Sequence, residues 1–179
     1  MSITPPSQKI WWNQPIDKIE AAWIGLALLW CLVLFLWMPY WHLYGKQNLS
    51  TESYKTTPEA FEKKTNEMIA KHTVRKEADG QMPVVAPPPG SNVYLAASKW
   101  AWSPILELRK GQSYRLHISS LDWQHGFSLQ PVNMNLQILP GYETVVTLTP
   151  TQTGEFGVIC NEFCGIGHHA MLGKIYVKD

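Results

Sequence analysis

The chain has 179 residues, which is enough for one folded domain and an appendage. Its formal net charge is +1, from 15 Lys and Arg against 14 Asp and Glu. This balance excludes the basic surface typical of proteins that bind nucleic acid. The nine Trp residues are unevenly spread, because six of them lie within the first quarter of the chain.

After an N-terminal segment, residues 1–18, we expect one membrane-spanning helix over residues 19–44. Ala21 to Met38 carries no charge, and roughly 20 apolar residues cross the hydrocarbon core of a bilayer. Trp and Tyr stand near both ends, as in the aromatic belts of membrane helices. A cleaved signal peptide is less well supported, because the apolar run is long and no small-residue cleavage pattern follows it. A buried helix of a soluble protein is a further alternative, since the run is hydrophobic all round.

Residues 45–90 read as a connector between this helix and the C-terminal part. Thr57 and Pro58 are typical of a helix start, as N-cap and first helical residue. We expect a helix from there to about Glu77, with a thin apolar stripe formed by Phe61, Met68 and Ile69. The Pro87-Pro88-Pro89 run predicts an extended spacer. Whether this spacer sets the height of the next domain above a membrane or is a plain linker stays open.

Residues 91–179 have the pattern of a β domain. Tyr114, Leu116 and Ile118 alternate with polar residues, which is the period of a half-buried strand. Eight such short runs are separated by turn residues: Asn92–Ala97, Ile105–Arg109, Tyr114–Ser119, Phe127–Gln130, Leu136–Leu139, Thr144–Thr149, Glu155–Cys160 and Gly173–Lys178. Many short strands at this spacing predict a mainly β fold, either a sandwich or a barrel.

The segment from Cys160 to Met171 is rich in soft metal ligands. It holds two thiols, an imidazole and a thioether within twelve residues, and this ligand set favours copper. Two thiolates facing one site would let a pair of copper ions share one electron. A Cys160–Cys164 disulfide is one alternative, because extracytoplasmic compartments are oxidising. A zinc site built from two Cys and two His is the other, although zinc does not use Met.

The spacing Cys-x-Glu-x-Cys-Gly-x-x-His-x-x-Met resembles the dinuclear copper (CuA) loop of subunit II of haem–copper terminal oxidases. That family has another His on an earlier loop, and His125 fits this position. The stretch Leu139-Pro140-Gly141-Tyr142 is also similar, so the match extends over about Asn92–Asp179. The resemblance implies a cupredoxin-like Greek-key β-barrel over residues 91–179, with both ligand loops at one end.

The resemblance also implies a role for each residue of the motif. The implied copper ligands are Cys160 and Cys164 as bridging thiolates, His125 and His168 as terminal imidazoles, Met171 as a weak thioether ligand and Glu162 through its backbone carbonyl. The Glu162 carboxylate stands where two-helix family members hold a magnesium ion at the subunit interface, so a magnesium ligand and a polar contact are both open. Trp100, with Trp102 as second choice, is expected to receive electrons from the donor.

A membrane protein of the short, single-helix B (ba) type is what the resemblance implies. The chain would be the electron-accepting subunit of a respiratory cytochrome c oxidase, an oxidoreductase and translocase of the electron transport chain. It would pass electrons from cytochrome c, or another small soluble donor, to haem in catalytic subunit I, which reduces O2 with proton translocation. This chain alone would not reduce O2. A CuA subunit of a nitric oxide reductase and a membrane-anchored copper carrier are the alternatives.

Charges flanking the apolar run do not set its orientation, because Lys9 and Lys18 before it balance Lys46 and Lys55 after it. A copper–thiolate site that meets a soluble donor belongs on the outer side of the membrane. We therefore expect a single-pass protein of the bacterial inner membrane, with a cytoplasmic N-terminus and a periplasmic copper domain.

Overall fold

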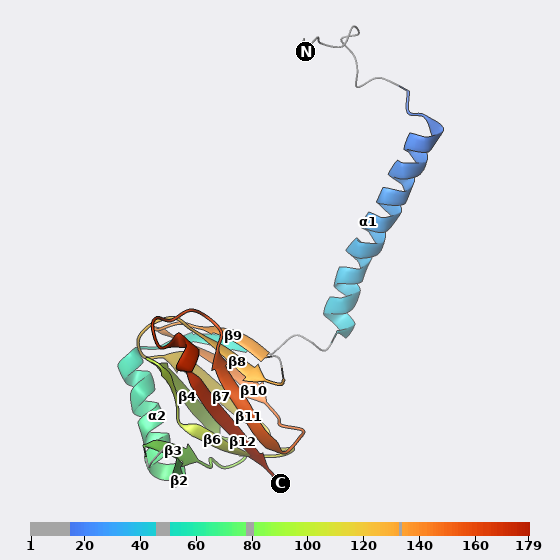
Figure 1. Ribbon diagram of the computed structural model, residues 1–179. Coiled ribbons are helices and arrows are strands. Elements are labelled where there is room, and N and C mark those ends of the chain that lie inside the picture. Colours follow the sequence, from blue (N-terminus) through green and yellow to red (C-terminus); the bar gives the residue numbers. More distant parts are fainter. Residues whose placement is uncertain (1–14, 46–50, 78–80, 133) are drawn as a thin grey trace, which may run out of the picture. The chain divides into compact units, whose positions relative to one another are not determined.

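A computed structural model describes residues 15–45, 51–77, 81–132 and 134–179 of the chain (Figure 1). The chain divides into two compact units, Met1–Asn48 and Leu49–Asp179. Most of the expected N-terminal segment, and residues 46–50 and 78–80 of the expected connector, lie outside the described residues.

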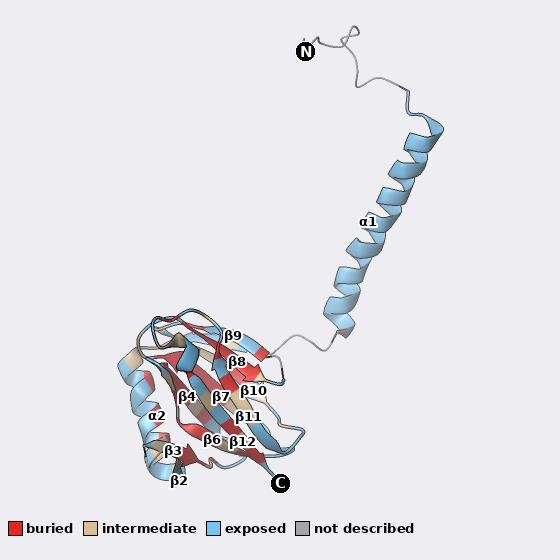
Figure 2. Cartoon of the chain, in the orientation of Figure 1, coloured by how far each residue is buried: buried red, intermediate tan, exposed pale blue. Residues whose placement is uncertain are grey.

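The described residues of the first unit form one helix, α1, which spans Lys18–Tyr44. The helix begins where the Asp17 carboxylate accepts a hydrogen bond from the backbone N–H of Glu20 at 2.7 Å. It ends at Gly45, whose backbone N–H donates to the Trp41 carbonyl. None of its residues is buried (Figure 2). The helix is long and apolar enough to cross a membrane, and its bounds agree with the predicted 19–44 to within one residue.

The described strands of the second unit form two β-sheets. The first has five strands in the order β1-β10-β7-β4-β5, with the bounds Thr51–Lys55, Tyr142–Leu148, Tyr114–Ser120, Asn92–Ser98 and Ala101–Ser103. The second has seven strands in the order β2-β3-β6-β12-β11-β8-β9, with the bounds Thr73–Glu77, Met82–Val85, Ile105–Arg109, Leu172–Lys178, Gly154–Cys160, His125–Gln130 and Met134–Ile138.

Parallel and antiparallel pairs are mixed in both sheets. Strand β4 runs parallel to β7, and β6 runs parallel to β12, whereas β8, β11 and β12 are joined by antiparallel pairs. The inner faces of both sheets enclose one core that includes Leu116, Ile118, Leu106, Phe127 and Ile175. The predicted cupredoxin-like β-barrel behind one N-terminal helix is therefore confirmed, and all eight expected strands are present.

Residues 51–85 were expected to form a connector, but their strands pair with strands of the barrel. Strand β1 pairs with β10 at an edge of the first sheet, and β2 and β3 extend the second sheet through β6. The predicted helix is found as α2, Pro58–His72, capped by Thr57, but it ends before Glu77. Its C-cap Thr73 is extended, and β-branched Thr73 and Val74 begin strand β2 instead.

The expected apolar stripe attaches α2 to the outer face of the first sheet. Phe61 is fully buried and meets the Tyr94 ring edge-on at 5.7 Å between ring centroids. The Met68 sulfur accepts a hydrogen bond from the backbone N–H of Tyr94 at 3.3 Å. This side of α2 is buried, while the other side remains exposed (Figure 2).

The ends of strands β8 and β11 bring His125 and the segment from Cys160 to Met171 to one end of the barrel. Strand β8 begins at His125, and the neighbouring β11 ends at Cys160, which pairs with Phe127. The loop that follows contains the short 3-10 helix η2, His168–Ala170, and leads directly into β12. The chain leaves β12 at the opposite end of the barrel, near the C-terminus (Figure 1).

Candidate metal centre

The two thiols of the loop lie side by side beneath the surface. Cys160 and Cys164 are 4% and 3% exposed, and their Sγ atoms are 3.6 Å apart. A disulfide needs about 2.05 Å between its sulfur atoms, and both cysteines are free. The pair therefore offers two sulfur ligands to one buried space.

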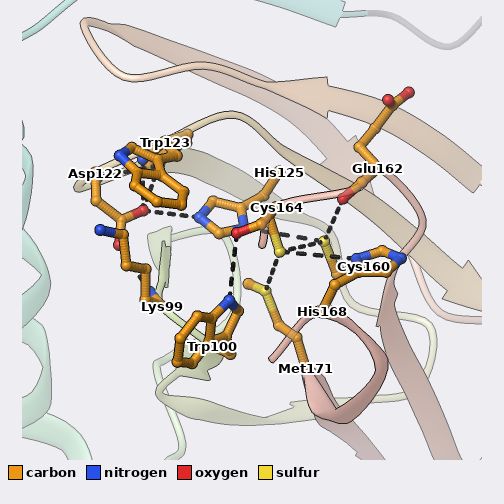
Figure 3. Close-up of polar contacts among 11 residues, drawn as sticks. Lys99, Trp100, Asp122, Trp123, His125, Cys160, Glu162, Cys164, His168 and Met171 are labelled. Atoms are coloured by element: carbon orange, nitrogen blue, oxygen red, sulfur yellow. Dashed lines mark hydrogen bonds and ion pairs between the residues drawn. The ribbon is translucent and has the colours of Figure 1, made fainter. Parts of the chain in front are cut away.

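Each thiol has an imidazole nitrogen beside it (Figure 3). The Cys160 Sγ lies 3.9 Å from His125 Nδ1, and the Cys164 Sγ lies 3.7 Å from His168 Nδ1. His125, Cys160 and Cys164 form a candidate metal cluster, with ligand atoms within 4.8 Å of one another. Two sulfurs and two nitrogens thus converge on one region.

Two weaker donors complete the set. The fully buried Met171 places its Sδ 3.8 Å from Cys164 Sγ, and the Glu162 backbone carbonyl accepts from Cys160 Sγ at 3.2 Å. The Glu162 carboxylate points away from the sulfur atoms (Figure 3). The structure therefore brings together all six donor groups predicted from the sequence, with Glu162 turned so that its carbonyl faces the thiols.

Asp122 fixes the orientation of the His125 ring. Its Oδ1 lies 2.8 Å from His125 Nε2, so the ring donates its proton there and keeps the Nδ1 lone pair on the side of the thiols. Burial would raise the pKa of Asp122, but hydrogen bonds from His125 and the backbone N–H groups of Trp123 and Lys99 hold it below its usual range. A negative carboxylate behind the imidazole makes Nδ1 a better metal ligand.

The Cys164 thiol is held in the protonated form by its surroundings. Burial and the adjacent Cys160 thiol raise the pKa of the Cys164 thiol to about 11. A metal ion must displace this proton in order to bind, which favours a soft cation with high affinity for thiolate. The donor set suggests copper, because zinc would use the two Cys and two His but has no use for the buried Met171 sulfur.

Glycines allow the ligand loop to approach its neighbours closely. A Cβ at Gly126 would collide with Asn161 and Glu162, and one at Gly167 would collide with the Trp100 ring. The Asn161 backbone N–H also donates to the Gly126 carbonyl at 3.2 Å. Gly126 and Asp122 were not identified as site residues from the sequence, although the Asp-x-x-His spacing is a signal that points to Asp122.

The two tryptophans expected to receive electrons differ in their positions. Trp100 is 38% exposed, and its indole N–H donates to the Cys164 carbonyl at 3.3 Å. Trp102 is 1% exposed and meets the His125 ring edge-on at 6.4 Å between ring centroids. The side chain of Trp102 points into the core from β5, so of the two only Trp100 reaches the surface, and the electron-entry role of either residue stays a prediction.

The surface around the ligand loop is apolar. Phe163 and Ile166 are 83% and 90% exposed, and Trp123 carries the Lys99 ammonium 3.5 Å above its ring. His169 is exposed, as expected for a polar neighbour of His168. His117 is buried on β7 and paired with Glu143, in agreement with its predicted structural role.

No family model matches the chain. It is 31% identical over 172 residues to "Cytochrome c oxidase subunit 2" of Thermus thermophilus, covering 93% of this chain and 96% of that protein. A second subunit 2 sequence from Thermus thermophilus is 36% identical over 118 residues, covering 63% of this chain and 87% of its own. A chain from a cryo-EM structure of a haem–copper terminal oxidase dimer has the same fold. It has a TM-score of 0.59 at 22% identity, over 90% of this chain and 100% of that one.

Proposed function

The chain belongs to the cytochrome c oxidase subunit 2 family, and from this premise we propose that it receives electrons at a dinuclear copper centre. The family is part of haem–copper oxidases, so a haem-bearing subunit I is its partner. Helix α1 and the family membership fit a membrane-anchored subunit. The enzyme to which it contributes is an oxidoreductase complex.

One observation carries the proposal of a copper pair. Two thiols 3.6 Å apart each have their own imidazole Nδ1 and their own weaker donor. A mononuclear blue copper site uses one thiolate, whereas two shared thiolates suit two copper ions. When bound, the copper pair would accept one electron and pass it on. The proposed ligands are Cys160 and Cys164 as bridges, His125 and His168 as terminal ligands, Met171 as a weak ligand and Glu162 through its carbonyl.

The residues of the chain would hold the centre rigid during electron transfer. Asp122 holds the His125 ring, and the loop backbone is fixed because the Cys160 N–H donates to the Met171 carbonyl at 3.2 Å. Ligands that are already in place need little rearrangement when the charge changes. The partly exposed Trp100, bonded to the Cys164 carbonyl, is the proposed residue through which electrons reach the site.

We propose that the electron donor is cytochrome c or another small soluble protein. The proposal places the N-terminus in the cytoplasm and the copper domain in the periplasm of a bacterial inner membrane, where such a donor is found. Haem in subunit I would take the electrons onward for O2 reduction and proton translocation. The Glu162 carboxylate, which points away from the thiols, would serve at the subunit interface either as a magnesium ligand or as a polar contact.

Co-purification tests this function. The chain, carrying an affinity tag, should bring down a haem subunit from its native membrane, and the complex should oxidise reduced cytochrome c with consumption of O2. A Cys160→Ser complex should keep the haem and lose cytochrome c oxidation. Turnover of NO in place of O2 would assign the complex to nitric oxide reduction, and a chain that isolates with copper and without haem would indicate a copper carrier.

A further inference from the structure

We propose that α1 packs against a transmembrane helix of the haem subunit through one face, the indole face, formed by Trp23, Trp30, Trp37 and Trp41. The identity of the partner rests on the proposed function. The choice of face rests on the geometry of α1 itself.

The indole face is narrow and differs chemically from the rest of the helix. At 3.6 residues per turn, the four Trp side chains of α1 project within an arc of about 40°. Positions 23, 30, 37 and 44 hold Trp, Trp, Trp and Tyr at intervals of seven residues. Leu28 and Leu32 lie on the opposite face, and Phe35 projects about 140° away from Trp30.

Trp30 lies at a depth where lipid does not suit an indole. It is 12 residues after Lys18 and 14 before Tyr44, about 18 Å and 21 Å along the helix axis, and so near the middle of the span. Tryptophan is usually enriched at the two membrane interfaces, where the N–H can reach water. The Trp30 ring is 63% exposed on α1, and its N–H has no hydrogen-bond partner among the described residues.

The hydrocarbon core offers no acceptor for this N–H, and leaving it unpaired there is unfavourable. The backbone carbonyls around Trp30 are used within the helix. A protein surface that carries an acceptor at this depth, such as a hydroxyl, a carboxyl or an unpaired carbonyl, would therefore cover Trp30 better than lipid does.

The seven-residue interval indicates that this surface is a helix. Contact residues repeat every 3.5 residues on average where two helices cross at about +20° with left-handed packing. A second copy of this chain is a poor occupant, because a symmetric dimer presents the same surface from both sides. Indole is a donor only, so two facing Trp30 side chains would offer each other no acceptor. A different chain is the better occupant, and the haem subunit is the one that the proposed function supplies.

Photo-cross-linking in the intact complex tests the face. We would place the photoreactive amino acid benzoylphenylalanine at position 30 in one variant and at position 32, on the opposite face, in another. Irradiated membranes should give an adduct with the haem subunit from position 30 and none from position 32. An adduct from position 32 only, a dimer of this chain from position 30, or lipid adducts alone would each overturn the proposal.

Paired substitutions then test the hydrogen bond. Trp30→Phe keeps an aromatic ring and removes the N–H, and it should weaken retention of the haem subunit in detergent about threefold, as for a typical interhelical hydrogen bond. Phe35→Leu, an aromatic loss on another face, should leave retention unchanged. Equal retention in both variants would contradict an acceptor at Trp30.

The copper signal of the unsubstituted complex separates the two proposals. If that signal is present and the adducts come from the wrong face, only the assignment of the indole face fails. If the copper pair is absent, the proposed function fails, while the cross-links still decide which face of α1 meets another protein.

Discussion

Asp122 and His125, three residues apart, are joined by a hydrogen bond of 2.8 Å between Oδ1 and Nε2. Asp122 also accepts the backbone N–H of Lys99 at 2.7 Å through its other oxygen. The carboxylate therefore links the turn that carries Trp100 to the imidazole that faces the thiols. A single residue outside the proposed ligand set thus holds two parts of the site in position.

Asp122→Ala should lower copper affinity roughly 10–100-fold, the usual effect of losing the partner of a metal-bound imidazole. Competition with a copper chelator measures this loss. Glu155→Ala, which removes an exposed ion pair with Lys174 at 2.8 Å, is the matched loss of a carboxylate and should leave affinity unchanged. Equal affinities for the two variants would show that Asp122 does not position the ring.

Trp100→Phe should slow reduction of the copper site by reduced cytochrome c without changing the copper spectrum. The indole N–H that bonds the Cys164 carbonyl at 3.3 Å would be lost, while the ring would still cover Gly167. Stopped-flow measurement of the first electron transfer gives the rate. Trp123→Phe is the control, since Trp123 is exposed near the same loop. An unchanged rate of the first electron transfer in Trp100→Phe would show that Trp100 only packs against the ligand loop.

Phe61→Ala should lower the free energy of unfolding of the β-barrel unit by about 3–5 kcal/mol, because a large buried ring is replaced by a cavity. Phe61 is fully buried between α2 and Tyr94. Urea unfolding of the full chain in detergent, followed by near-UV circular dichroism, measures the change. Glu62→Ala, the next residue on the exposed side of α2, should alter it by less than about 0.5 kcal/mol. Similar values for both variants would mean that α2 does not stabilise the barrel.

Strand β1, within residues 51–77, could not be predicted from the sequence. Eight of the nine strands after residue 91 were predictable, because alternating apolar residues mark one buried face, whereas the three-residue strand β5 was not predicted. Strand β1 has the sequence Thr-Glu-Ser-Tyr-Lys and no buried residue, so no such alternation marks it. It is fixed by backbone pairing with β10 and by the pair between Arg115 and Glu52, at 3.0 Å. Contacts of this kind depend on partners distant in the chain.

The candidate site was predictable to a similar degree. The resemblance to the CuA loop implied the six donor groups, and the structure brings these groups together at the start of β8 and in the segment from the end of β11 to β12. Trp100 and Trp102 are two residues apart in the sequence, and only the structure separates them. Trp100 lies in the turn before β5, whereas Trp102 lies within β5 and points into the core.

Acid should destabilise the barrel partly through Glu107. Burial works to raise the pKa of Glu107, but hydrogen bonds from Arg75 and Lys178 hold it below its usual range. The ion pairs therefore contribute stability above the unfolded pKa of about 4.3, and this contribution is lost as the pH falls through the lower folded value. Unfolding measured at pH 7 and at successively lower pH should show Glu107→Gln less stable than the unsubstituted chain, with the difference shrinking in acid. A difference independent of pH would contradict this assignment.

The central claim, a copper pair shared by Cys160 and Cys164, is tested most directly by electron paramagnetic resonance with a copper count. The full chain in detergent, loaded with copper, should bind two copper ions and show hyperfine structure from one electron shared over two copper nuclei. Cys160→Ser and Cys164→Ser should each abolish that signal. One copper per chain with hyperfine structure from a single nucleus, or a preference for zinc, would contradict the account.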